Sequence, residues 1–113
     1  MKHTKKILKI DDIFGTGFVG VYIQTTLRKL RDEFGCESFT NPTNEKITHE
    51  WGFKIINEDD EDGILTIYDW KEYREIQLDE ELEYHIGGKN ISKEDILEFL
   101  NDNKLGGDYT LQE

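Results

Sequence analysis

Residues 46–70 read KITHEWGFKIINEDDEDGILTIYDW, and this stretch decides the fold. Apolar or ring-bearing side chains take every second position over residues 47–55, the period of a half-buried antiparallel strand. The five consecutive acids at 58–62 cannot pack in a core, and the Asp-Gly pair that closes them is a favoured hairpin dipeptide. The sequence therefore predicts a β-hairpin with strands over 46–56 and 64–70 and a turn over 57–63.

Further strands are predicted on both sides of this hairpin. Residues 5–14 and 18–23 are rich in β-formers, and Gly15-Thr16-Gly17 between them is typical of a tight turn. Apolar residues alternate with Glu83 and His85 over 82–86, which predicts a strand that the Gly87-Gly88 pair ends. The polar stretches 36–45 and 71–81 are interpreted as loops.

Two amphipathic helices are predicted. The first begins after Thr25 or Thr26, either of which can cap it, and ends at Gly35, in the place of a left-handed C-terminal glycine. The second covers residues 93–102 behind Ser92, which with an acid three positions on resembles a capping box. Their apolar stripes consist of Leu27, Leu30 and Phe34 in the first helix and of Ile96, Leu97, Phe99 and Leu100 in the second.

The predicted element order is ββαβββα, with short connections and no βαβ alternation. This order indicates an α+β fold, in which an antiparallel sheet of about five strands carries two helices on one face. A chain of 113 residues fits a single domain, 1–113, and we expect residues 1–4 and 108–113 to be flexible. The other face of the sheet, interpreted as carrying Val19, Val21 or Ile23, is left to water or to a second copy in a homodimer.

The charge of the chain restricts its partners. The chain has 25 acids and 14 bases, which gives a formal net charge of −11. This charge disfavours bulk attraction to nucleic acid or to an anionic membrane, and it favours a basic protein as the partner. No apolar run reaches the roughly 18 residues of a membrane span. A lone cysteine, Cys36, suits a reducing compartment. We expect a cytoplasmic protein, in the host cytoplasm if the chain is viral.

Metal, cofactor and catalytic sites have little support in the sequence. The acidic turn nearly matches the calcium-binding loop of an EF-hand, but strands flank it and the short Asp69 takes its last position. Two interpretations of the turn remain, a solvated hairpin and a weak cation site. His3, His49 and His85 lack metal-ligand spacing, and Cys36 follows a helix C-terminus, which disfavours a thiolate. We therefore expect no metal, no cofactor and no enzymatic activity, while a small hydrolase stays a minor alternative.

The candidate ligand site combines aromatic rings with isolated cations. Two neighbouring strands would present flat rings and one imidazole, and a glycine-rich bend before a helix can point N–H groups at an anion. The ordinary alternative is sheet packing by the rings and a simple strand-to-helix turn. The predicted ligand-binding residues are Tyr68, Trp70, Lys71, His85, Gly87, Gly88 and Lys89.

Several of these residues belong to motifs that resemble a group of small phage-encoded accessory proteins. The shared motifs are Glu50-Trp51, Asp62-Gly63, Thr66-Ile67-Tyr68-Asp69-Trp70-Lys71 and His85-Ile86-Gly87-Gly88, within roughly residues 18 to 100. The chain departs from the pattern at Tyr84, where the group has tryptophan. The resemblance implies a viral accessory protein that acts against host immunity.

Two functions follow from this implication. In the first, the protein sequesters a small nucleotide-derived signal, with the base stacked on Tyr68 or Trp70 and the phosphates held by Lys71, Lys89 and the diglycine amides. In the second, it is an acidic mimic of nucleic acid that inhibits a basic host effector, with residues 58–62 as part of the decoy surface. The motifs favour the first function, and the net charge favours the second.

Overall fold

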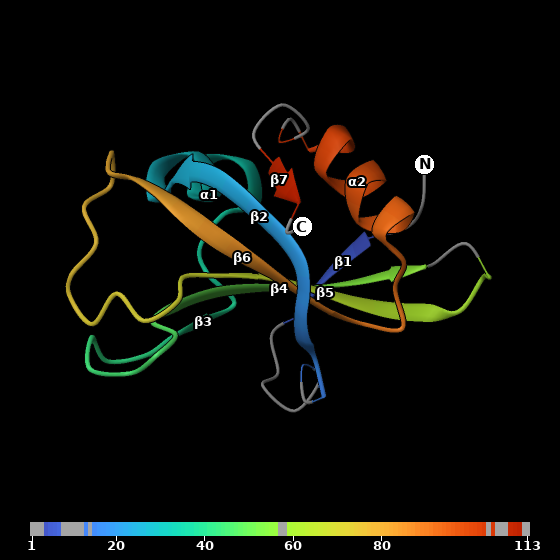
Figure 1. The fold of residues 1–113 in the computed structure, drawn as a ribbon, viewed down its shortest axis with the longest axis horizontal. Helices are drawn as coiled ribbons and strands as arrows, with labels where there is room; N and C mark the ends of the chain where they lie inside the picture. The colour runs from blue at the N-terminus through green and yellow to red at the C-terminus, as the bar shows by residue number, and fades with distance from the viewer. Residues whose placement is uncertain are drawn as a thin grey trace.

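The computed structural model describes residues 4–7, 13, 15–56, 59–103 and 105, together with the backbone of 109–111. Within them, the strands are β1 (Thr4–Ile7), β2 (Gly17–Thr26), β3 (Phe39–Thr40), β4 (His49–Ile56), β5 (Asp62–Tyr68), β6 (Glu81–Lys89) and β7 (Tyr109–Leu111). The helices are α1 (Leu27–Phe34) and α2 (Lys93–Asp102). Figure 1 shows their arrangement.

The described strands form one antiparallel seven-stranded sheet in the order β1-β4-β5-β6-β2-β7, with β3 also paired to β4. The predicted hairpin is present as β4 and β5, whose pairing starts with Ile56 opposite Asp62. The α+β fold class is confirmed. The sheet has more strands than expected because β3 and β7 are two and three residues long, too short to give a periodic signal.

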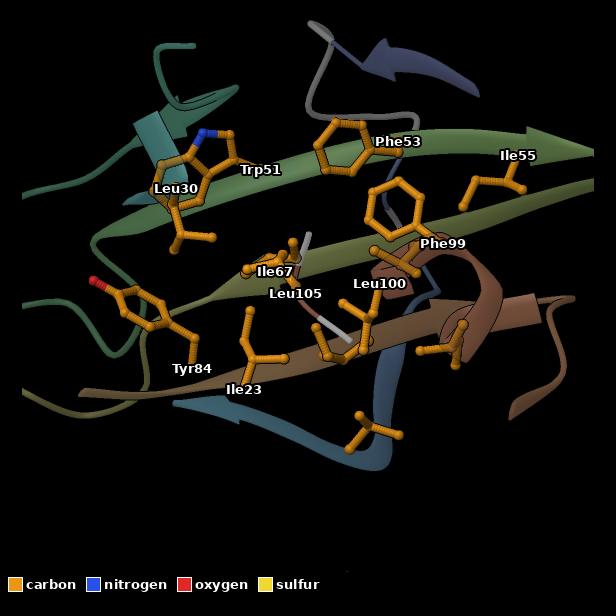
Figure 2. Close-up of a cluster of buried hydrophobic side chains, with 14 of the residues drawn as sticks. Ile23, Leu30, Trp51, Phe53, Ile55, Ile67, Tyr84, Phe99, Leu100 and Leu105 are labelled. Atoms are coloured by element: carbon orange, nitrogen blue, oxygen red, sulfur yellow. The ribbon is translucent and has the colours of Figure 1, made fainter. Parts of the chain in front are cut away.

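Both helices lie on the same side of the sheet, as expected (Figure 1). The odd-numbered residues of β4, β5 and β2 and the even-numbered residues of β6 face them, because successive side chains of a strand point to opposite faces. Figure 2 shows the resulting core, in which Phe99 from α2 lies 5.1 Å from Phe53 of β4 between ring centroids. The fully buried members include Val21, Ile23, Leu30, Trp51, Leu65, Ile67, Tyr84, Ile86, Ile96 and Leu100.

The helix ends follow the predicted capping chemistry. Of the two threonines, Thr26 caps α1, and its hydroxyl accepts a hydrogen bond from the Lys29 amide at 3.1 Å. Gly35 ends this helix with a φ of 79°, a left-handed backbone that glycine adopts without strain. At α2, the Ser92 hydroxyl accepts from the Asp95 amide at 3.1 Å while Asp95 reaches back to the Ser92 amide, so the capping box is complete.

The sequence predictions about the pairing of β1 with β2 and about the open face of the sheet are wrong. β1 and β2 do not form a hairpin, because β1 pairs with β4 and β2 pairs with β6 and β7. Residues 109–111, in the tail expected to be flexible, form β7. The flexibility expected for residues 1–4 and 108–113 stays a prediction, and residues 1–3, 108 and 112–113 lie outside the described part. Val21 and Ile23 do not belong to the open face of the sheet, since both are fully buried under the helices.

The Gly87-Gly88 pair does not end β6, which continues to Lys89. The glycines are needed for close packing on both faces. A Cβ added at Gly87 would lie 2.5 Å from the Thr66 hydroxyl oxygen, and one added at Gly88 would lie 2.7 Å from a methyl carbon of Ile91. The pair therefore lets neighbouring side chains approach the sheet, and it provides no bend before α2.

Candidate ligand-binding site

The face of the sheet opposite the helices carries a row of polar and aromatic side chains. The register places Glu50 of β4 opposite Tyr68 of β5, Tyr68 opposite His85 of β6, and His85 opposite Tyr22 of β2. Directly opposed residues of antiparallel strands point to the same face and lie close enough to touch. Four adjacent strands thus bring these four side chains, up to 63 positions apart in sequence, into one line.

In the neighbouring row, Gly87 lines a pocket, whereas Gly52 is covered by Ile7 and Ile13. Gly52, Thr66 and Gly87 are opposed across β4, β5 and β6. The Thr66 side chain is buried, and its hydroxyl has no hydrogen-bond partner in the described structure. A pocket of about 490 Å³ opens here, with Gly87 and the four residues of the first row in its lining. Its size is in the range typical of small-molecule sites.

Aromatic rings form most of the pocket wall, with His85 at their centre. Its imidazole centroid lies 4.9 Å from Tyr22, 5.0 Å from Phe18, 5.6 Å from Tyr68 and 6.0 Å from Trp70. These spacings are those of favourable ring contacts. Phe18 is 38% exposed and Trp70 is 36% exposed, which is unusual for rings of this size and leaves flat apolar surface open to a ligand.

The pKa values of Glu50, Tyr68 and His85 in the pocket are shifted toward the neutral forms of these groups. Burial, assisted by the nearby charge of Asp69, raises the pKa of Glu50 to about 7. Burial likewise raises the pKa of Tyr68 to about 12 and lowers the pKa of His85. At neutral pH His85 and Tyr68 are uncharged and Glu50 is divided between acid and carboxylate. No lysine or arginine lines the described pocket.

A buried hydrogen-bond cluster fixes the chain where it leaves β5 toward Trp70. One carboxylate oxygen of Asp69 accepts from the amides of Thr48 at 2.7 Å and of His49 at 2.9 Å. The other accepts from the Thr48 hydroxyl and lies 3.2 Å from Nδ1 of His49. Burial alone would raise the pKa of Asp69, but the hydrogen bonds from His49 and Thr48 outweigh it and lower the pKa. Asp69 thus connects β5 to the start of β4 and positions Trp70 beside the pocket.

The structure brings together four of the seven predicted ligand-binding residues, since Tyr68, Trp70, His85 and Gly87 all line the pocket. The remaining three do not line it. The ammonium of Lys71 lies 5.5 Å from the centre of the Trp70 ring, outside the lining. Gly88 faces the helix side of the sheet, and Lys89 ends β6 with its side chain near Gly15.

The sequence reasoning missed Phe18, Tyr22, Ile47 and Glu50, which also line the pocket. Glu50 could have been found from the hairpin register, which places it opposite Tyr68. Phe18 and Tyr22 carried no such signal, because β2 was predicted to pair with the wrong strand.

No family model, curated protein or solved structure matches this chain. The functional assignment therefore rests on the pocket and on the chemistry of the residues around it.

Two further features bear on the sequence predictions. Within the described residues, no group of three or more His, Cys, Asp or Glu side chains is arranged to hold a metal ion, and Cys36 is exposed. None of the helices in the described ranges combines the length and apolar character needed to cross a membrane.

Proposed function

We propose that this protein is a non-enzymatic binding protein that captures and sequesters a small nucleotide-derived molecule, in the manner of a phage accessory protein acting against host defence. The observation that carries the proposal is the aromatic pocket on the open face of the sheet. Its partly exposed Phe18 and Trp70 offer flat surface for a base, and base stacking on aromatic side chains is worth about 1–3 kcal/mol per base.

The base, and not the phosphate, belongs inside the pocket in this proposal. The described lining carries a carboxyl group and no cation, so it would repel a phosphate. Cations lie outside it. Lys71 is beside Trp70, and Lys46 lines an adjoining hollow of about 600 Å³ that shares Trp70 and Ile47 with the pocket. A nucleotide can place its base against the rings and its phosphate near Lys46 and Lys71.

Sequestration is favoured over turnover by the kind of groups that face the pocket. His85 is surrounded by rings and its pKa is lowered by burial, so it supplies a stacking surface and a neutral hydrogen-bonding ring. Rings that contact the faces of a ligand bind substrate, transition state and product about equally well. Such binding does not accelerate a reaction, so the pocket suits capture better than catalysis.

Thermal unfolding in the presence of single nucleotides tests the proposal. The panel contains nucleoside monophosphates, cyclic nucleotides and ADP-ribose-type molecules. We expect one subset to raise the melting temperature, Trp70→Ala to abolish the rise, and Leu78→Ala to preserve it, because Leu78 is similarly exposed but lies outside the pocket. Ligand recovered by chromatography should be chemically unchanged. A panel without any stabilising member would refute the proposal, and a modified ligand would replace sequestration with enzymatic turnover.

The second candidate function, an acidic mimic of nucleic acid, is favoured by the tip of the β4–β5 hairpin. Asp59, Asp60, Glu61 and Asp62 are all exposed there, at the opposite end of the hairpin from Glu50 and Tyr68; Glu58 lies outside the described residues. This function predicts salt-sensitive binding to a basic protein that Asp60→Asn with Asp62→Asn weakens and Trp70→Ala leaves unchanged.

A further inference from the structure

We propose that Glu50 selects the ligand by accepting hydrogen bonds from two adjacent N–H groups on the edge of its ring, which is the pattern that guanine presents and adenine lacks. The inference rests on the proposed function and deepens it, because it names the class of base that the pocket prefers.

Glu50 differs from the other buried acids of the described chain, Asp69 and Asp95. Asp69 accepts two amide and one hydroxyl hydrogen bond, and Asp95 is held by the amide and hydroxyl of Ser92. Glu50 as a residue is 6% exposed, and no described residue donates a hydrogen bond to its carboxyl or forms an ion pair with it. A buried carboxyl without donors is destabilising, so its place in a pocket wall points to a ligand that supplies them.

The two oxygens of an ionised carboxyl only accept hydrogen bonds, and they can accept a parallel pair. Guanine offers such a pair in its ring N–H and its neighbouring amino group. Adenine offers one acceptor beside one donor, which a carboxylate cannot match. The raised pKa of Glu50 agrees with a carboxyl that is poorly satisfied in the free protein and gains most from a ligand with donors.

The arrangement of the rings favours a flat base over an organic cation. Tyr22, His85 and Tyr68 are consecutive cross-strand neighbours. The His85 ring is tilted 45° from Tyr68 and stands at 87° to Tyr22, so a flat base would stack on one of these rings with the edges of the others beside it. Glu50 follows them in the same row and would meet the edge of such a base. A cage around a cation would need rings on several sides.

Calorimetric titration with guanosine, inosine and adenosine monophosphates at about pH 8, where Glu50 is mostly ionised, tests the inference. We expect the guanine nucleotide to bind about tenfold or more tightly than the adenine nucleotide, with inosine between them because it lacks the amino group. Glu50→Gln should remove most of this preference, since an amide offers one donor and one acceptor. Glu83→Gln, at an exposed position on the same face of β6, should keep it.

The outcomes separate the two levels of the proposal. Nucleotide binding that depends on Trp70 but shows no base preference, or a preference unchanged in Glu50→Gln, would overturn the role of Glu50 and leave the capture function standing. Tetramethylammonium binding that disappears in Glu50→Gln, without nucleotide binding, would overturn both in favour of a cation site. Guanine preference that only Glu50→Gln removes would support both.

Discussion

Replacing Glu50 with glutamine is expected to make the protein more stable at alkaline pH, although the residue lies in the proposed binding pocket. The folded-state pKa of Glu50 is about 7, against an ordinary value of 4.5, because the side chain is buried near Asp69. Between these values the folded state holds a proton that the unfolded state has lost, so stability falls as pH rises through this range. The difference amounts to about 3 kcal/mol of unfolding free energy at pH 8.

Urea unfolding of the wild type, Glu50→Gln and Glu83→Gln from about pH 5 to pH 8.5 measures this effect. The lowered pKa of His85 acts in the opposite direction below about pH 6.5, so the informative quantity is the difference between variant and wild type. That difference should be small at pH 5 and should grow to its full size by pH 8 for Glu50→Gln only. A constant difference, or an equal one in the exposed control Glu83→Gln, would refute the account of Glu50 as a buried, unpaired acid.

Three further variants test other parts of the structure by the same unfolding assay. Asp69→Ala should lower the free energy of unfolding by about 3–5 kcal/mol at neutral pH, because the amides of Thr48 and His49 lose their acceptor. The loss should shrink in acid, as Asp69 is protonated in the wild type. Ser92→Ala should lose about 1 kcal/mol with its capping box, and Ser92→Asn should restore much of it. Gly87→Ala should lower the free energy of unfolding by about 1–3 kcal/mol, because the added methyl group overpacks against Thr66, and it should weaken nucleotide binding. An unchanged free energy of unfolding would contradict the close packing at this position.

The parts of the fold that sequence could predict are those determined by local patterns. Alternation over residues 47–55 and the acidic turn specified the β4–β5 hairpin, and Thr26, Gly35 and Ser92 specified the helix ends. The strands that pair with β1 and β2 could not be predicted from local patterns. A strand pattern indicates which face is buried but not which neighbour provides the hydrogen bonds, and β2 pairs with a strand more than 50 residues away.

The candidate site could be predicted only in part for the same reason. Tyr68, Trp70 and His85 were identified by their chemistry, and Glu50 is recoverable from the register of one hairpin. Phe18 and Tyr22 enter the pocket through the pairing of β2 with β6, which no local signal encodes. A glycine pair is typical of a bend, which explains the wrong prediction for the diglycine; here Gly87 makes room for Thr66 of the neighbouring strand and Gly88 for Ile91, which follows β6.

Several departures from ordinary packing lie together around the pocket on the open face of the sheet, and their grouping at one place is an argument for a binding site. The helix caps and the Asp69 cluster have their buried polar groups satisfied. The open face holds the Glu50 carboxyl, which has no partner among the described residues, an unpartnered hydroxyl at Thr66 and exposed rings at Phe18 and Trp70. On the helix side, the buried hydroxyls of Thr25 and Tyr84 also lack a described partner. Sequences usually keep such unfavourable features where function requires them. The substitution expected to stabilise the chain, Glu50→Gln, is therefore also the one expected to remove its discrimination between bases.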